Sequence, residues 1–81
     1  MEPAEDDESL AWRGQQGEQS AFEELVNRYQ RRIFNLAYRM TGDYEEAEDI
    51  AQEVFVRAYY NLSRFKRGRR FVPWLLKIAY N

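Results

Sequence analysis

The chain has 81 residues, a net charge of −2, and neither Cys nor His. A chain this short supports one small domain, because it buries only about 60% of the surface that its unfolded form exposes. The missing residue types exclude disulfide bonds, the usual zinc sites and Cys or His catalysis, so we expect no enzyme, no metal site and no cofactor.

Charge is segregated along the chain. Residues 1–27 carry eight acids and one base, residues 28–42 four bases, residues 43–54 six acids, and residues 55–81 seven bases. A solvated helix surface usually mixes the two signs, so this segregation indicates two partners of opposite charge. The alternative is that the charges only keep a small bundle soluble.

The opening residues, MEPAEDDES, are acidic rather than basic and apolar, and only short apolar runs follow. Neither a signal peptide nor a membrane span fits this pattern, so we expect a cytoplasmic protein. Residues 1–9 are predicted to form a flexible acidic tail, although helical spacing begins near Asp7, and residues 10–81 are predicted to form one domain.

Helices account for the rest of the chain. The first is predicted over 7–16, with Leu10 and Ala11 facing inward and Gly17 as its stop. The second ends at Gly42 and has one apolar stripe at three-and-four spacing. The stripe consists of Phe22, Leu25, Val26, Tyr29, Ile33, Leu36, Ala37 and Met40.

A third helix begins after Asp43, which is a good N-cap with Glu46 three positions on. Its predicted buried side consists of Ala47, Ile50, Ala51, Val54, Phe55, Ala58, Tyr59 and Leu62. A loop is expected over 63–70, and Pro73 suits the first turn of a short fourth helix with Trp74, Leu75 and Ile78 inward. The prediction is an all-α fold, a compact bundle of three main helices and a short terminal one.

The third helix has a second stripe, which begins acidic and ends apolar. Its residues are Asp49, Gln52, Glu53, Val56 and Tyr60. Such a face suits docking on a basic partner helix, with charge for steering and apolar area for residence. A solvated face with Tyr60 at the bundle edge explains the spacing equally well.

The end of the chain combines cations with aromatic rings. The cations are Arg64, Lys66, Arg67, Arg69, Arg70 and Lys77, and the rings are Phe65, Phe71, Trp74 and Tyr80. This combination suits single-stranded nucleic acid, whose phosphates bind Lys and Arg and whose bases stack on rings. A small domain also needs large apolar side chains inside, which favours a core position for Trp74 and leaves Phe71 open.

Three separated motifs resemble one family. They are A-F-x-x-L-V-x-R-Y from Ala21, D-I-A-Q-E-V-F-V-R-A-Y from Asp49, and F-x-x-W-L-x-x-I-A-x-N from Phe71. In this order and spacing they are similar to the sigma-2 domain of bacterial sigma factors of the extracytoplasmic-function (ECF) group. The resemblance covers about residues 10–81.

The resemblance implies that Asp49, Gln52 and Glu53 dock on the clamp helices of the RNA polymerase β′ subunit. It further implies that residues 63–81 capture the non-template strand of the minus-ten promoter element and hold one flipped base in a pocket. Asn81 belongs to that pocket, where its amide offers a donor and an acceptor. Arg39 on the second helix is a further candidate for the same strand.

The loop FKRGRRF is more basic than the family's usual Gly-Asp-Ser or Gly-Ser type, and Pro73 before the Trp is unusual. The chain also ends at Asn81 without a sigma-4 domain, which indicates an isolated or truncated domain. A protein-interaction module bound by an anti-sigma factor remains an alternative function. A helix-turn-helix duplex reader fits less well, because F-V-P-W-L-L is too apolar for a major groove.

Overall fold

The structure is a computed structural model that describes residues 4–81. It contains four α-helices and one short 3₁₀ helix, and no strand occurs in this part of the chain. The elements are α1 (Asp7–Gln15), α2 (Gln19–Thr41), α3 (Tyr44–Asn61), η1 (Leu62–Arg64) and α4 (Phe71–Tyr80). The predicted all-α fold is therefore confirmed.

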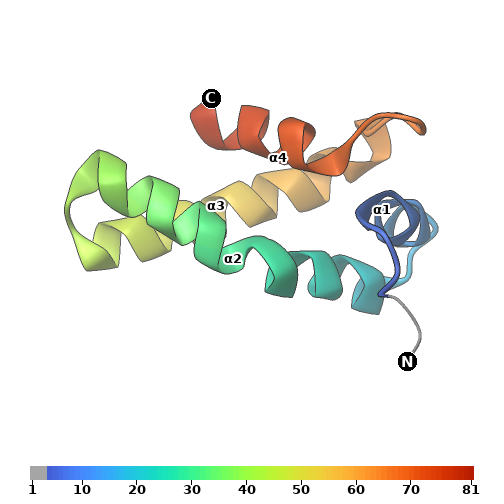
Figure 1. Cartoon of the computed structure of the whole chain (residues 1–81), viewed down its shortest axis with the longest axis horizontal. Helices are drawn as coiled ribbons and strands as arrows, with labels where there is room; N and C mark the ends of the chain where they lie inside the picture. Colours follow the sequence, from blue (N-terminus) through green and yellow to red (C-terminus); the bar gives the residue numbers. More distant parts are fainter. Residues whose placement is uncertain (1–3) are drawn as a thin grey trace.

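Helices α2 and α3 form an antiparallel pair, and α4 lies along α3 (Figure 1). Helix α1 is seen almost end-on in this view, beside the start of α2 and close to the segment that joins α3 to α4. It packs on α2, on η1 and on α4. The first helix of the chain therefore lies against the segment that joins α3 to α4, near the other end of the chain.

The helix ends follow from local chemistry. The amide of Gly42 donates to the carbonyl of Tyr38 at 2.8 Å with a φ of 69°, a left-handed conformation that ends α2. One residue later, the side chain of Asp43 accepts from the amide of Glu46 at 2.9 Å, which confirms the predicted N-cap of α3. Residues 42 and 43 alone thus reverse the chain.

The N-terminal segment is more ordered than predicted. Asp6 caps α1 by accepting from the amide of Ser9 at 2.8 Å, and Glu5 forms an ion pair with Arg13. Residues 7–9 already belong to α1. The predicted flexible tail is therefore wrong for residues 5–9, and its first three residues lie outside the described residues.

The core confirms most of the predicted inward positions. The largest fully buried side chains are Phe71, Leu25, Ile33, Leu75 and Val54. Two predictions are wrong, because Met40 is 63% exposed and Tyr59 is 48% exposed. Met40 lies in the last turn of α2, where α3 only begins, and Tyr59 lies at the core edge, with its ring 5.3 Å from that of Phe22. Within residues 4–81, no helix is both long and apolar enough for a bilayer crossing.

Candidate nucleic-acid and protein interfaces

The predicted nucleic-acid residues lie mostly on the surface, around the segment between η1 and α4. All but one of the nine are exposed, namely Arg64, Lys66, Arg67, Arg69, Arg70, Lys77, Tyr80 and Asn81. Gly68 has a φ of 90°, and the amide of Arg69 donates to the carbonyl of Lys66 at 3.1 Å. This turn spreads five cations over seven residues, and we call residues 64–70 the basic loop.

Phe71 is the exception, and the prediction that it contacts DNA is wrong. Only 1% of it is exposed, so no base can stack on its ring. The ring lies 5.8 Å from that of Phe65 and 5.7 Å from that of Trp74, between centroids. This aromatic cluster is the anchor of α4, because a domain this small needs its largest apolar side chains in the core.

The basic loop has little internal charge compensation. Within residues 4–81, every ion pair uses Arg13 or Arg28, so none involves a loop cation. Arg67 instead lies over the ring of Trp12, with its Cζ 5.2 Å from the ring centroid. Side chains of like charge repel one another, so the loop favours a polyanionic ligand.

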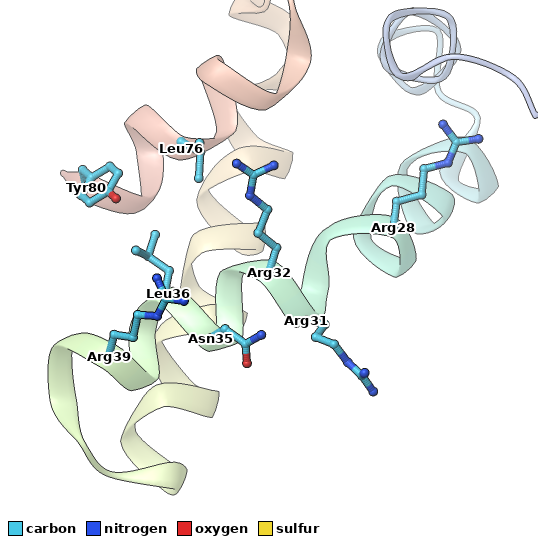
Figure 2. A pocket seen from close by; sticks show the side chains of 8 residues that line it. All are labelled: Arg28, Arg31, Arg32, Asn35, Leu36, Arg39, Leu76 and Tyr80. Carbon is cyan, nitrogen blue, oxygen red and sulfur yellow. The ribbon is translucent and has the colours of Figure 1, made fainter.

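A second basic surface lies between α2 and α4. Its lining residues are Arg28, Arg31, Arg32, Asn35, Leu36, Arg39, Leu76 and Tyr80. Figure 2 shows Arg32 extending from α2 toward α4, Arg39 beside Leu36, and Arg31 pointing away from α4. Tyr80 is 65% exposed, so this groove has cations on α2 and an open aromatic ring on α4. The groove extends the basic surface beyond the loop.

Sequence reasoning found this groove only in part. Arg39 was named as a candidate, whereas Arg28, Arg31 and Arg32 were not. The signal was present, because residues 28–42 hold four bases and no acid. What the pattern does not contain is the position of α4, which forms the other wall of the groove.

The predicted docking face on α3 is exposed along its whole length. Asp49, Gln52 and Glu53 are exposed, and they are followed on the same face by Val56 at 48% and Tyr60 at 77% exposure. Exposed apolar side chains of this size favour a partner over plain solvent. The five residues therefore form a continuous ridge, acidic at one end and apolar at the other.

A groove between α2 and α3 adjoins this ridge. Gln52 and Val56 belong to both, and α2 contributes a wall that the sequence did not reveal. That wall includes Val26, Gln30 and Phe34, and Tyr44 of α3 meets Phe34 edge-on at 5.0 Å. The one sequence feature that indicates this wall is Phe34, a large apolar residue that lies outside the apolar stripe of α2.

A partly buried polar contact joins α1 to α2. The hydroxyl of Tyr29 donates to Asp7, and Arg28 donates to the same carboxylate at 3.0 Å. Burial, then the hydrogen bond to Asp7, raises the pKa of Tyr29 to about 12. The phenol therefore keeps its proton at neutral pH and remains a donor.

This geometry agrees with the comparisons to known proteins. The family model described as Sigma-70 region 2 matches residues 25–81. The chain belongs to this family, and its relatives identify it as the sigma-2 domain of an ECF-group sigma factor. The two relatives described next are named as RNA polymerase sigma factors, which agrees with the expectation that the chain is not an enzyme.

Two relatives show the extent of the similarity. The ECF RNA polymerase sigma factor SigW of Bacillus subtilis is 51% identical over 65 residues, which cover 80% of this chain and 35% of that protein. The RNA polymerase sigma-H factor of Pseudomonas aeruginosa is 43% identical over 77 residues, or 95% of this chain and 40% of that protein. The chain thus spans well under half the length of these curated relatives.

A solved structure is also similar. It is the NMR structure of the complex formed by an engineered region 2 of sigmaE with GTAAAA. The TM-score is 0.91 at 38% identity, and the match covers 100% of this chain and 84% of that one. The arrangement of all four helices is therefore that of a sigma region 2.

Proposed function

We propose that this domain docks on RNA polymerase through α3 and captures the non-template strand of the minus-ten promoter element with the basic loop and α4. In this role it acts in the cytoplasm, as part of transcription initiation. Asn81 holds one flipped base at the C-terminal end of α4, the basic loop binds the strand at the other end of this helix, and Arg39 contacts the strand from α2. The observation that carries the proposal is the separation of the exposed ridge on α3 from an exposed basic loop that forms no ion pair within residues 4–81.

Single-strand capture is supported by the chemistry of the loop and by the similar structure. The loop presents five cations in seven residues, and Tyr80 offers an exposed ring at the far end of α4. Phosphates bind such cations and unpaired bases stack on such rings. The similar region 2 was solved with GTAAAA, a sequence that is not self-complementary and so does not pair with itself.

Docking on polymerase is supported by the composition of the ridge. Asp49 and Glu53 supply charge for a basic partner helix, and Val56 and Tyr60 supply apolar area. The adjoining groove, with Phe34 and Gln30 on its α2 wall, is open for side chains of the same partner. The clamp helices of the β′ subunit are the proposed occupant.

Energetics limit what the domain does alone. Opening about ten base pairs costs more than ten kcal/mol, because stacking contributes roughly 1.4 kcal/mol per step. Each base stacked on an aromatic ring returns only about 1–3 kcal/mol. We therefore expect the isolated domain to bind pre-opened strands and to leave a linear promoter duplex closed. Opening of that duplex without polymerase would contradict the proposal.

The test is binding of fluorescent oligonucleotides of equal length, one single-stranded and one duplex. The proposal predicts a clear preference for the single strand and a strong decrease of affinity with salt. Equal or tighter binding to the duplex would reject strand capture. Binding to neither would favour the alternative, an interaction module whose basic loop serves a protein such as an anti-sigma factor.

A further inference from the structure

Helix α1 contacts the basic loop at both ends and in the middle. Figure 1 shows α1 directly beside the segment that joins α3 to α4. Three of its side chains make these contacts, and they are spaced at 8, 12 and 15 along one face of the helix. None of the three belongs to the motifs on which the docking and capture surfaces rest.

Gln15 holds the start of the loop. Its Nε2 donates to the carbonyl of Leu62 at 2.8 Å and to that of Phe65 at 2.7 Å. The two hydrogens of one amide thus bind two carbonyls at the end of η1, where helix carbonyls run short of backbone partners. The carbonyl of Leu62 also accepts from the amide of Phe65 at 3.0 Å. This contact joins residues that are 47 and 50 positions apart in the sequence.

Glu8 holds the end of the loop. Its Oε2 accepts from the amide of Phe71 at 2.9 Å, although the two residues are 63 positions apart. Arg70 is the N-cap residue of α4, and its side chain makes no capping bond. Glu8 therefore replaces the missing local cap, and its negative charge lies at the positive end of the α4 dipole.

The middle of the loop is held more weakly, and its flanks are buried. Arg67 lies over the ring of Trp12, which is itself 41% exposed. Phe65 and Phe71 anchor the loop on either side, at 5% and 1% exposure. Only residues 66–70 remain between the two anchors, and all five are exposed.

We propose that α1 is a splint for the basic loop, by which we mean that it holds the loop in one conformation before the strand binds. Gln15 and Glu8 are then positioning residues for the DNA strand. This inference rests on the proposed strand capture. A loop fixed before binding loses less conformational entropy when the strand arrives, so affinity increases without any new contact to DNA. Neither residue touches the strand in this role; each acts through the loop backbone.

The test compares variants of the whole chain, with a fluorescein-labelled single strand containing GTAAAA as the probe. Glu8→Ala and Glu8→Gln both remove one negative charge, but only the Gln side chain keeps an oxygen that accepts from the amide of Phe71. Gln15→Met keeps the length of the side chain and removes the donor. Circular dichroism first shows that each variant is folded at the temperature of the binding assay.

Glu8→Ala is expected to bind the strand about fivefold more weakly than Glu8→Gln. Gln15→Met, which loses two hydrogen bonds, is expected to bind it at least about fivefold more weakly than the unchanged chain. A fivefold change corresponds to about 1 kcal/mol at 1.4 kcal/mol per tenfold, the net contribution of one hydrogen bond. The log–log slope of affinity against salt should stay unchanged, because no phosphate contact is lost. In hydrogen exchange, the amide of Phe71 should be protected in Glu8→Gln and unprotected in Glu8→Ala.

Equal affinities within both pairs would overturn the splint, and so would a change in the salt slope. Should one variant fail to fold, the other pair still decides. The joint replacement of Arg67, Arg69 and Arg70 by Ala separates this outcome from failure of the proposed function. If that variant loses affinity while the α1 variants do not, strand capture stands and the splint is wrong; if it too binds normally, strand capture itself is wrong.

Discussion

Replacement of Arg67, Arg69 and Arg70 by Ala should flatten the salt dependence of single-strand binding. The structure shows all three exposed, with no ion pair to any residue in 4–81. Each Arg that neutralises one phosphate of a single strand contributes about 0.7 to the log–log slope, so the three together contribute about 2.1. Between 50 and 200 mM salt, the unchanged chain should therefore lose about 18-fold more affinity than the variant.

The assay is fluorescence anisotropy of a labelled single strand at several salt concentrations. The matched control replaces the same three residues by Lys, which keeps the charges and should keep the slope. Since the three side chains lie outside the core, melting temperatures should change little. An unchanged slope in the Ala variant would show that these side chains do not contact phosphates, and the assignment of the basic loop would then be wrong.

Asp49→Lys should weaken binding to a β′ clamp-helix fragment at least about tenfold, because it places like charges together. The thermal melt of the variant should stay unchanged. Full binding in a pull-down titration would place the interface elsewhere. Tyr29→Phe should destabilise the fold, and this effect should shrink as the pH rises from 10 to about 12. The reason is that the raised pKa of Tyr29 stabilises the fold fully below pH 10 and no longer does so above the folded value. Urea unfolding of both chains across this range measures it, and a constant difference would refute the reasoning. Gly42→Ala should cost about 1 kcal/mol of unfolding free energy, because φ is 69° there although the space around it is open; an unchanged urea midpoint would contradict this.

Much of the fold was predictable because local rules and burial agree in this chain. The stripe of α2, the stop at Gly42 and the cap at Asp43 depend on spacing and on short-range hydrogen bonds, both of which the sequence contains. The prediction that Met40 is buried is wrong because an apolar stripe does not show where the partner helix begins. Periodicity gives the direction in which a side chain points, but the neighbouring element decides whether anything covers it.

The candidate site was predictable in composition and less so in geometry. The exposed cations and the ridge on α3 follow from charge and spacing, whereas Phe71 looked equally suited to stacking and to the core. Its burial depends on Phe65 and Trp74, which only the tertiary fold brings together. The hydrogen bonds of Gln15 and Glu8 join residues that are 47 to 63 positions apart in the sequence, and no local pattern predicts a contact at such a separation.

The contact between Glu8 and α4 bears on the choice of boundaries when this domain is produced as a fragment. The match to the family model starts at residue 25, and a fragment trimmed to that boundary discards α1 entirely. It would lose the buried side chains of Leu10 and Ala11, together with the hydrogen bonds by which Gln15 and Glu8 hold the two ends of the loop. Such a shortened piece would keep every residue that the family model matches and still present its arginines on a backbone that α1 no longer holds.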